Sequence, residues 1–302
     1  MRLPIHILLQ TTIEYDANDW HIGRFTLLHN YLAGLTSDGQ PLFRVTARDR
    51  GPVGAPDPVL ASLDTSGYDE LWLFAVDTGN GLHADDLAAI SRFRRRGGGL
   101  LVTRDHMDLG CSICALDGVG AAHVFHSHNV DPHGATPAPD DRGTPRILWP
   151  NFHSGANGDY QRIAPVAPLH ALLRDPDADG GVVAYLPAHP HEGAVAAPAG
   201  DASARVIATG VSKASGSVFN LAVAFEAGAA CGPALAESTF HHFADYNWQP
   251  SCGCPDFVSE PPGGSLAATP QALRSTQRYM LNLALWLAGR LNQSGPAHSV
   301  DA

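Results

Sequence analysis

Positive charge is scarce in this chain. Its 302 residues include 19 lysines and arginines against 30 aspartates and glutamates, which gives a formal charge of −11, and lysine occurs once, at Lys213. Nucleic-acid binding needs a broad basic face. The one basic run, residues 92–96, is short and typical of the solvated C-terminal end of a helix. The composition therefore excludes a nucleic-acid partner.

Long apolar runs and cysteines are also scarce. No stretch approaches the ~20 apolar residues that span a bilayer, and the start of the chain is too short and polar for a signal peptide. We therefore expect a cytoplasmic protein without a membrane partner. An odd number of cysteines favours reduced thiols; zinc ligation by four of them is the alternative, although the second pair lacks zinc-knuckle spacing. The five are Cys111, Cys114, Cys231, Cys252 and Cys254.

No internal repeat and no break in composition divides the chain, so we expect one domain over residues 1–291. A chain of this length can bury about 75% of its unfolded surface. Residues 123–165 are rich in Pro, Gly, His and Asp, which predicts an excursion over the surface or over a pocket. Residues 249–268 are predicted to be a long loop, a kind of segment that is commonly functional, and residues 292–302 a flexible tail.

Apolar runs alternate with helical periodicity in the first third of the chain. Four runs, at residues 5–10, 43–47, 71–76 and 100–103, are predicted strands. Residues 21–35 and 83–96 repeat apolar side chains at steps of three and four, the period of a helix. This alternation predicts an α/β fold with a mainly parallel sheet.

The later apolar runs follow one another without helices between them. They lie at residues 182–186, 205–209, 219–225 and 234–240 and indicate an antiparallel extension of the sheet. Thr269 and Pro270 then predict the capped start of a terminal helix, because Thr suits the capping position and Pro the first turn.

The segment from residue 71 to residue 103, with Gly97-Gly98-Gly99 between its helix and its last strand, resembles the class I glutamine amidotransferase-like superfamily. It is most similar to the ThuA-like (trehalose-utilisation-protein-like) branch. The resemblance implies a three-layer, flavodoxin-like fold over residues 1–290. It also implies a cysteine nucleophile at the turn after the strand and a late His-Pro-Glu motif that activates it.

The turn after residues 100–103 departs from that pattern. Residues 103–110 read TRDHMDLG and contain no cysteine, and Cys111 falls inside the predicted following helix. We therefore expect no glutaminase activity; a glutaminase that uses Cys111 is the alternative. Asp105 and His106 are predicted at the mouth of the sheet as catalytic residues, with helix capping as the alternative role of the aspartate.

Two histidine groups follow later predicted strands and supply the other catalytic candidates. His189, His191 and Glu192 resemble the family motif with an extra histidine, and in an extended segment His189 and His191 face the same side. We predict that these three hold one divalent ion, zinc, manganese or iron; hydrogen-bonded loop histidines are the alternative. Of His241 and His242 only one can face the site from a strand, and Asp245 is predicted to orient it.

Two polar loops are predicted to bind the substrate. The first follows the first strand and the second lies within the excursion, and their amide, imidazole and carboxylate groups suit a polar small molecule such as a polyol. As an alternative, Asn-Gly and Gly-Asp are ordinary turn formers. The candidate residues are Glu14, Asp19, His21, Asn151, His153, Asn157 and Asp159.

Two functional hypotheses stay open at this point. The first is an enzyme without the cysteine machinery that uses a His/carboxylate pocket, in metal-assisted hydrolysis of a polar small molecule, with no nucleotide cofactor. The second is a non-catalytic ligand-binding or assembly protein with a degenerate site. The sequence does not decide whether the chain forms a homo-oligomer.

Overall fold

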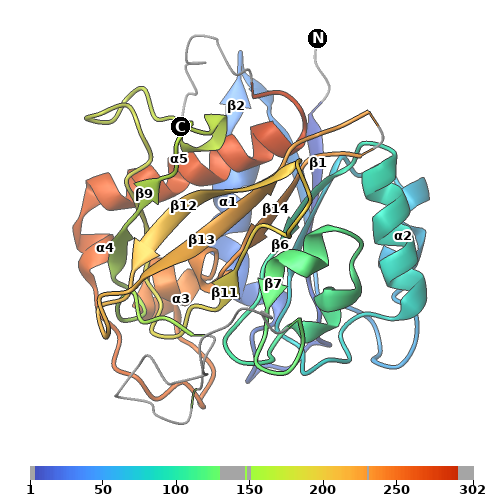
Figure 1. The fold of residues 1–302 in the computed structure, drawn as a ribbon, viewed down its shortest axis with the longest axis horizontal. Coiled ribbons are helices and arrows are strands. Elements are labelled where there is room, and N and C mark those ends of the chain that lie inside the picture. The colour runs from blue at the N-terminus through green and yellow to red at the C-terminus, as the bar shows by residue number, and fades with distance from the viewer. Residues whose placement is uncertain (1–3, 130–146, 148–150, 230, 292–302) are drawn as a thin grey trace.

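An eight-stranded mixed sheet forms the centre of the computed structural model, which describes residues 4–129, 147, 151–229 and 231–291 (Figure 1). The predicted tail, residues 292–302, and much of the predicted excursion lie outside the described residues. Across the sheet the order is β4 (Phe43–Arg48), β1 (Ile5–Thr11), β5 (Glu70–Phe74), β6 (Gly99–Val102), β14 (Ala234–Glu237), β13 (Val218–Phe225), β12 (Ala204–Val211) and β9 (Ala164–Pro165).

The first five of these strands are parallel and the last three continue the sheet antiparallel. This confirms the α/β class, the parallel centre and the antiparallel extension. Two details of the prediction are wrong. β14 pairs parallel with β6, with Ala236 opposite Val102, and residues 182–186 supply only β10 (Tyr185–Pro187), which pairs outside the main sheet.

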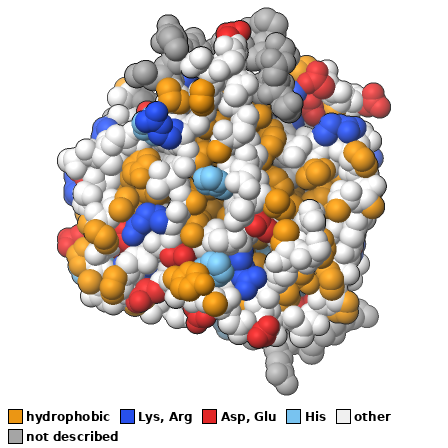
Figure 2. Space-filling model, turned by 180° about the vertical axis from the view of Figure 1, so that it is seen from behind, with side chains coloured by type: hydrophobic (Ala, Val, Ile, Leu, Met, Phe, Trp, Pro, Cys, Tyr) orange, Lys and Arg blue, Asp and Glu red, His pale blue; other side chains and the backbone are white. Residues whose placement is uncertain are grey.

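Helices cover both faces of the sheet because successive side chains of each buried strand point to opposite sides. In β5, Leu71 and Leu73 join the core beneath α2 (Ala84–Arg95), whereas Trp72 and Phe74 join the core beneath α1 (Thr26–Gly34) and α5 (Pro270–Leu287). Figure 1 shows the resulting three layers. On the face turned to the viewer in Figure 2, basic side chains lie dispersed among acidic and apolar ones.

Short elements make up the rest of the described chain. Three small pairs of strands are β2 (Thr36–Ser37) with β3 (Gln40–Pro41), β8 (Tyr160–Arg162) with β10, and β7 (His123–Val124) with β11 (Ala194–Val195). Two further α-helices are α3 (Asp245–Trp248) and α4 (Ser265–Ala268). The 3₁₀ turns are η1 (Ile22–Phe25), η2 (Leu60–Thr65), η3 (Cys111–Ala115), η4 (Val119–Ala122), η5 (Ala171–Leu173), η6 (Phe240–His242) and η7 (Pro250–Cys252).

Local chemistry explains where α2 begins. The His83 side chain caps α2 by accepting a hydrogen bond from the N–H of Asp85. The Asp86 carboxylate in turn accepts from the N–H of His83, which completes a capping box. α5 begins with Pro270 as predicted, but Thr269 makes no side-chain capping bond. The predicted long loop at residues 249–268 contains η7 and α4. Among the described residues, no helix is long and apolar enough to cross a membrane.

The glycine triplet after α2 allows the close packing of β6 against α5. Gly97 adopts a φ of +101°, a conformation that favours glycine, where α2 ends. A Cβ on Gly99 would lie 2.5 Å from the carbonyl oxygen of Leu287 in α5. The backbones of the strand and the helix therefore approach too closely for any side chain.

We expect Gly99→Ala to lower the free energy of unfolding by about 1–3 kcal/mol, because α5 must shift to accommodate the methyl group. Gly34→Ala is the matched control: a Cβ there meets nothing within 4 Å, so the change should be neutral or stabilise by up to about 1 kcal/mol. Urea unfolding of both variants measures the difference. Equal effects would contradict the close-packing account.

The buried carboxylate of Asp57 fixes the segment between β4 and η2 by hydrogen bonds. Asp57 accepts hydrogen bonds from the Arg48 guanidinium (2.7 Å) and from the backbone N–H groups of Gly51, Val59 and Leu60. Burial raises the pKa of Asp57, but these donors outweigh burial and hold the pKa well below its ordinary value. The charged form therefore contributes to stability.

We expect Asp57→Asn to cost about 1–3 kcal/mol at pH 7, because the amide cannot replace the charged acceptor. Since the folded pKa is depressed, this stabilisation is present above the unfolded pKa of about 4 and is lost as the pH falls through the folded value. Urea unfolding between pH 7 and pH 3 should show the gap between wild type and variant narrowing. The exposed Asp179→Asn should change stability by less than about 0.5 kcal/mol throughout; a pH-independent gap for Asp57→Asn would be contrary to expectation.

Candidate functional site

The candidate site lies at the carboxyl edge of β6 and β14. Because these neighbouring strands are parallel, the segments that follow them leave the sheet side by side, the usual position of a site in an α/β fold. Two backbone hydrogen bonds join the three segments involved. The N–H of Phe240 donates to the carbonyl of Arg104, and the N–H of Gly193 donates to the carbonyl of Ser238, both at 2.9 Å.

Asp105, His189 and His241 converge at this edge. Each offers one ligand atom, the three atoms lie within 4.8 Å of one another, and all three residues are buried. The rings of His189 and His241 stack with centroids 3.5 Å apart at 11°. His189 Nε2 lies 3.7 Å from Asp105 Oδ1, too far for a hydrogen bond, and has no hydrogen-bond partner among the described residues.

The protonation states of this triad follow from burial. Burial lowers the pKa of His189 to about 3 against the opposing effect of Asp105, and burial together with the neighbouring His189 lowers the pKa of His241. Burial raises the pKa of Asp105, but the adjacent histidines outweigh it and keep that pKa well below its ordinary value. At neutral pH the site therefore presents two neutral imidazoles and one carboxylate.

Two further histidines border the triad. His106 Nδ1 contacts Asp105 Oδ1 at 3.1 Å, and burial, which lowers the pKa of His106, is outweighed by this pairing, so the pKa is raised. His191 lies edge-on to both His106 and His189, with centroids 5.5 and 5.6 Å apart, and contacts Glu260 at 3.1 Å. The side chains of His106 and Glu260 are 21% and 26% exposed, so these two groups face the solvent side of the site.

Glu192 does not join the triad. Its carboxylate accepts hydrogen bonds from Ser154, Gln161 and Ser238 and lies 3.4 Å from His242 Nε2. The structure thus brings only His189 of the predicted set His189, His191 and Glu192 to the converging ligands. Ser154 also accepts from the N–H of His189 at 2.9 Å, so Glu192 anchors the segment that carries His189.

The two adjacent histidines of η6 have opposite environments. Thr239 caps η6, and successive residues of a 3₁₀ turn point about 120° apart, so His241 faces Asp105 while His242 faces two carboxylates. His242 Nδ1 lies 3.0 Å from Glu237, which also accepts from the Tyr279 hydroxyl. Burial lowers the pKa of His242, but Glu192 and Glu237 outweigh burial and raise it to about 10.

Asp245 does not orient the site imidazole, contrary to prediction. Its two carboxylate oxygens accept from the backbone N–H groups of Thr26 (3.0 Å) and Leu27 (2.8 Å), the first residues of α1. Helix N-termini have free N–H groups and favour negative charge, which explains this position. Asn247, two residues later, contacts His241 Nδ1 instead, at 2.8 Å.

Of the predicted substrate-binding residues, Asn157 reaches the triad, contacting His189 Nδ1 at 2.9 Å. Each of the other six contacts a group outside the triad. Asp159 binds Ser265 at the start of α4, His21 caps η1, Glu14 accepts from Val53 N–H, Asp19 accepts from Trp20 N–H, Asn151 donates to the carbonyl of Ile147, and the carbonyl of His153 accepts from Lys213 N–H.

Sequence reasoning missed three residues beside the histidines. Asn247 contacts His241, Trp20 lies edge-on to His241 with centroids 4.8 Å apart, and Glu260 contacts His191. Trp20 and Glu260 come from loops that carry no periodic pattern. Asn247 could have been found from its position six residues after His241. Because β14 ends at Glu237, the two residues lie in the turns that follow the strand and can contact each other.

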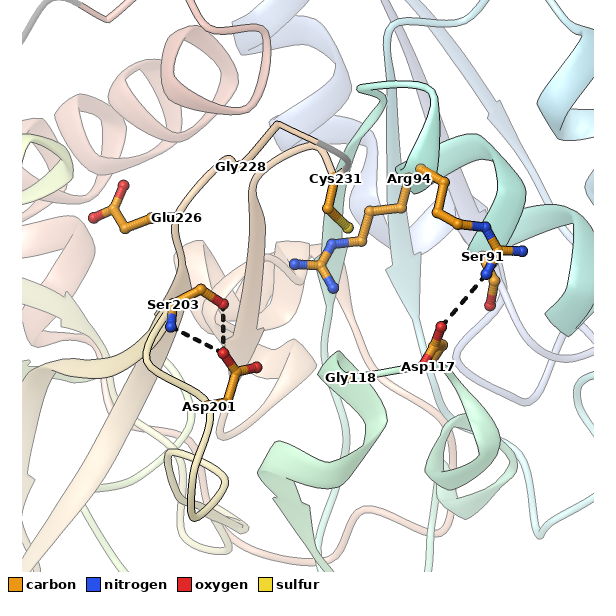
Figure 3. Close-up of a pocket in the computed structure, with 10 residues that line it drawn as sticks. Ser91, Arg94, Asp117, Gly118, Asp201, Ser203, Glu226, Gly228 and Cys231 are labelled. Carbon is orange, nitrogen blue, oxygen red and sulfur yellow. Dashed lines mark hydrogen bonds and ion pairs between the residues drawn. The ribbon is translucent and has the colours of Figure 1, made fainter.

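A separate pocket of about 250 Å³ lies at the opposite, amino edge of the sheet (Figure 3). Its walls come from the end of α2, the segment before β12 and the segment between β13 and β14, and Arg94 extends between them. Arg94 donates from Nε to the carbonyl of Gly232 at 3.1 Å, and Asp201 accepts from Ser203. Neither His189 nor His241 lines this pocket.

No protein-family model matches the sequence, and no curated protein matches it. Solved structures do resemble it. A ThuA-like protein from Parabacteroides merdae superposes with a TM-score of 0.52 at 14% identity, covering 97% of this chain and 94% of that one. A ThuA-like protein from Bacteroides uniformis has a TM-score of 0.47 at 10% identity over 98% and 96% of the two chains. The glutaminase domain of a Trypanosoma brucei CTPS has a TM-score of 0.43 at 12% identity over 97% and 96%.

The first of these similarities shows the fold. The chain has the fold of that ThuA-like protein, as the resemblance inferred from residues 71–103 led us to expect. The turn after β6, where the resemblance led us to look for a cysteine, carries Asp105. Cys111 begins the 3₁₀ turn η3 and not the predicted helix.

The imidazolium of His242 should be the main stabiliser of the two buried carboxylates beside it. We expect His242→Leu to lower the free energy of unfolding by about 3–5 kcal/mol at pH 7, because Glu192 and Glu237 lose their shared cation. Tyr279→Phe, which removes only one hydrogen bond to Glu237, should cost about 1–2 kcal/mol. Urea unfolding tests this order; a His242→Leu variant as stable as Tyr279→Phe would refute it.

Proposed function

We propose that the chain is a metal-dependent enzyme that hydrolyses a polar small molecule, with one divalent ion held by Asp105, His189 and His241. The observation that carries this proposal is the convergence of three buried ligand atoms within 4.8 Å. The buried Nε2 of His189 supports it, because a polar atom without a hydrogen-bond partner among the described residues is costly unless something binds it.

The donor set fits a catalytic ion better than a structural one. Two imidazoles and one carboxylate suit zinc, manganese or iron, and three protein ligands leave open positions for water and substrate. When bound, such an ion polarises a substrate carbonyl or activates a water molecule. A histidine binds a metal when its imidazole is neutral, and a carboxyl group when it is ionised. The depressed pKa values of His189, His241 and Asp105 give these groups those states at neutral pH.

The chain's own groups around the triad suit a polar substrate. His106, with its raised pKa, holds a proton beside Asp105, and His191 presents a second imidazole next to it. Glu260 faces the solvent side, which with the net charge of −11 disfavours anionic substrates. We therefore propose a neutral or cationic molecule with several hydrogen-bonding groups.

Cysteine chemistry is disfavoured as the activity. Burial raises the pKa of Cys111, and Asp77 and Asp108 raise it further; burial raises the pKa of Cys114 to about 12. A catalytic thiol needs a lowered pKa. All five cysteines are free thiols, which supports the proposal of a reducing, cytoplasmic location.

Metal binding is the first test. Untagged protein loaded separately with Zn²⁺, Mn²⁺ and Fe²⁺ should retain about one equivalent of at least one of them, and the ion should be lost in His189→Gln, His241→Gln and Asp105→Asn. His170→Gln is the matched control, because His170 is also buried but pairs with Glu226. Metal analysis by mass spectrometry reads the stoichiometry. Wild type without any of the three ions, or triad variants that keep the ion, would refute the site.

Activity is the second test, and it separates an enzyme from a binding protein. The metal-loaded protein should hydrolyse members of a panel of neutral esters, amides and glycosides, lose activity with a chelator and regain it when the ion returns. Retention of the ion without hydrolysis of any panel member would favour the non-catalytic alternative.

A further inference from the structure

Two asparagines contact the Nδ1 atoms of the stacked imidazoles. Asn157 Oδ1 contacts His189 Nδ1 at 2.9 Å and Asn247 Oδ1 contacts His241 Nδ1 at 2.8 Å. Both amides are buried, at 2% and 0% exposure. Each imidazole is thus engaged through Nδ1 by an amide oxygen.

One backbone carbonyl sets the direction of these hydrogen bonds. The carbonyl of Ala188 can only accept, so the group of Asn247 that contacts it at 2.9 Å must be the amide nitrogen. The same nitrogen contacts Asn157 at 2.8 Å, which makes that atom of Asn157 the oxygen. The amide orientations therefore follow from the network.

The direction continues into the two rings. The oxygen of Asn247 faces His241 Nδ1 and the oxygen of Asn157 faces His189 Nδ1, so each nitrogen must carry the proton. A neutral imidazole has one N–H, and the lone pair of each ring is then on Nε2. For His189 this is the nitrogen that lies 3.7 Å from Asp105 without a hydrogen bond.

We infer that Asn157 and Asn247 are positioning residues that fix both histidines as Nδ1–H tautomers and so direct their Nε2 atoms to the metal. The inference rests on the proposed metal site and extends it to two residues that touch no ion. Metal-ligating histidines commonly donate their other N–H to a fixed acceptor, and loss of that acceptor costs metal affinity. Ala188 and His189 are adjacent, so one segment supplies both the reference carbonyl and a ligand.

The two asparagines should respond differently to aspartate. In Asn157→Asp an oxygen still accepts from His189 and from Asn247, so zinc affinity should stay within about threefold of wild type or rise. In Asn247→Asp an oxygen replaces the nitrogen and faces the Ala188 carbonyl and Asn157 Oδ1, so affinity should fall. Asn157→Leu and Asn247→Leu should each lower affinity by about 10–100-fold.

Zn²⁺ competition against a chromophoric chelator measures these affinities. Asn282→Leu is the matched control, because Asn282 is a buried asparagine that donates to the Leu172 and Arg174 carbonyls away from the site; it should lose stability and keep zinc affinity. If the leucine variants do not fold, the contrast between Asn157→Asp and Asn247→Asp decides the inference. Equal affinities across the four site variants would overturn it.

A measurement on the metal-free protein separates this inference from the proposed function. Long-range ¹⁵N–¹H NMR of the histidine rings should show Nδ1–H tautomers for His189 and His241 in wild type, with His189 losing that state in Asn157→Leu and His241 losing it in Asn247→Leu. Nε2–H rings in wild type would overturn the inference. A wild type that binds no zinc but shows Nδ1–H rings refutes the metal site alone and upholds the tautomer assignment.

Discussion

Parallel pairing of β14 with β6 is the constraint on which the site depends. The two strands are more than 130 positions apart in the chain, yet their carboxyl ends meet at one edge because they run in the same direction. That edge brings Asp105 and His241 together, and the hydrogen bond from Gly193 to Ser238 adds His189. An antiparallel β14 would have sent the two segments to opposite edges of the sheet.

The buried polar side chains of the site form two groups, one around His241 and one around His242, although these two residues are neighbours in η6. His241 stacks on His189 among neutral amides and stays neutral, whereas His242 lies between Glu192 and Glu237 and carries charge. Both imidazoles are buried, so the surrounding groups and not solvent access decide their charge. The charged group around His242 holds the backbone of the site in place, and the two neutral imidazoles together with the Asp105 carboxylate present the ligand atoms.

The fold was more predictable than the site. Runs such as residues 71–76 indicate strands because burial on both faces leaves a continuous apolar pattern, and the absence of cysteine at the turn before Gly110 was visible directly. Asp105, His189 and His241 were each predicted as site residues, but not as one cluster. The prediction assumed an extended segment in which His189 and His191 face the same side, whereas a turn separates them. The partners of Glu192 and Asp245 are distant in sequence, and no local pattern encodes a contact such as Asp245 with Thr26.

The capping of α1 by Asp245 has a consequence for synthesis of the chain on the ribosome. The helix is complete after residue 34, but the carboxylate that closes its first turn emerges more than 200 residues later. Until β14 has been synthesised, one edge of β6 also lacks its partner strand, and an unpaired strand edge is prone to pair with another chain. The nascent chain thus passes most of its translation without this central strand. The same short stretch, residues 234–247, supplies β14, the ligand His241 and the cap of α1.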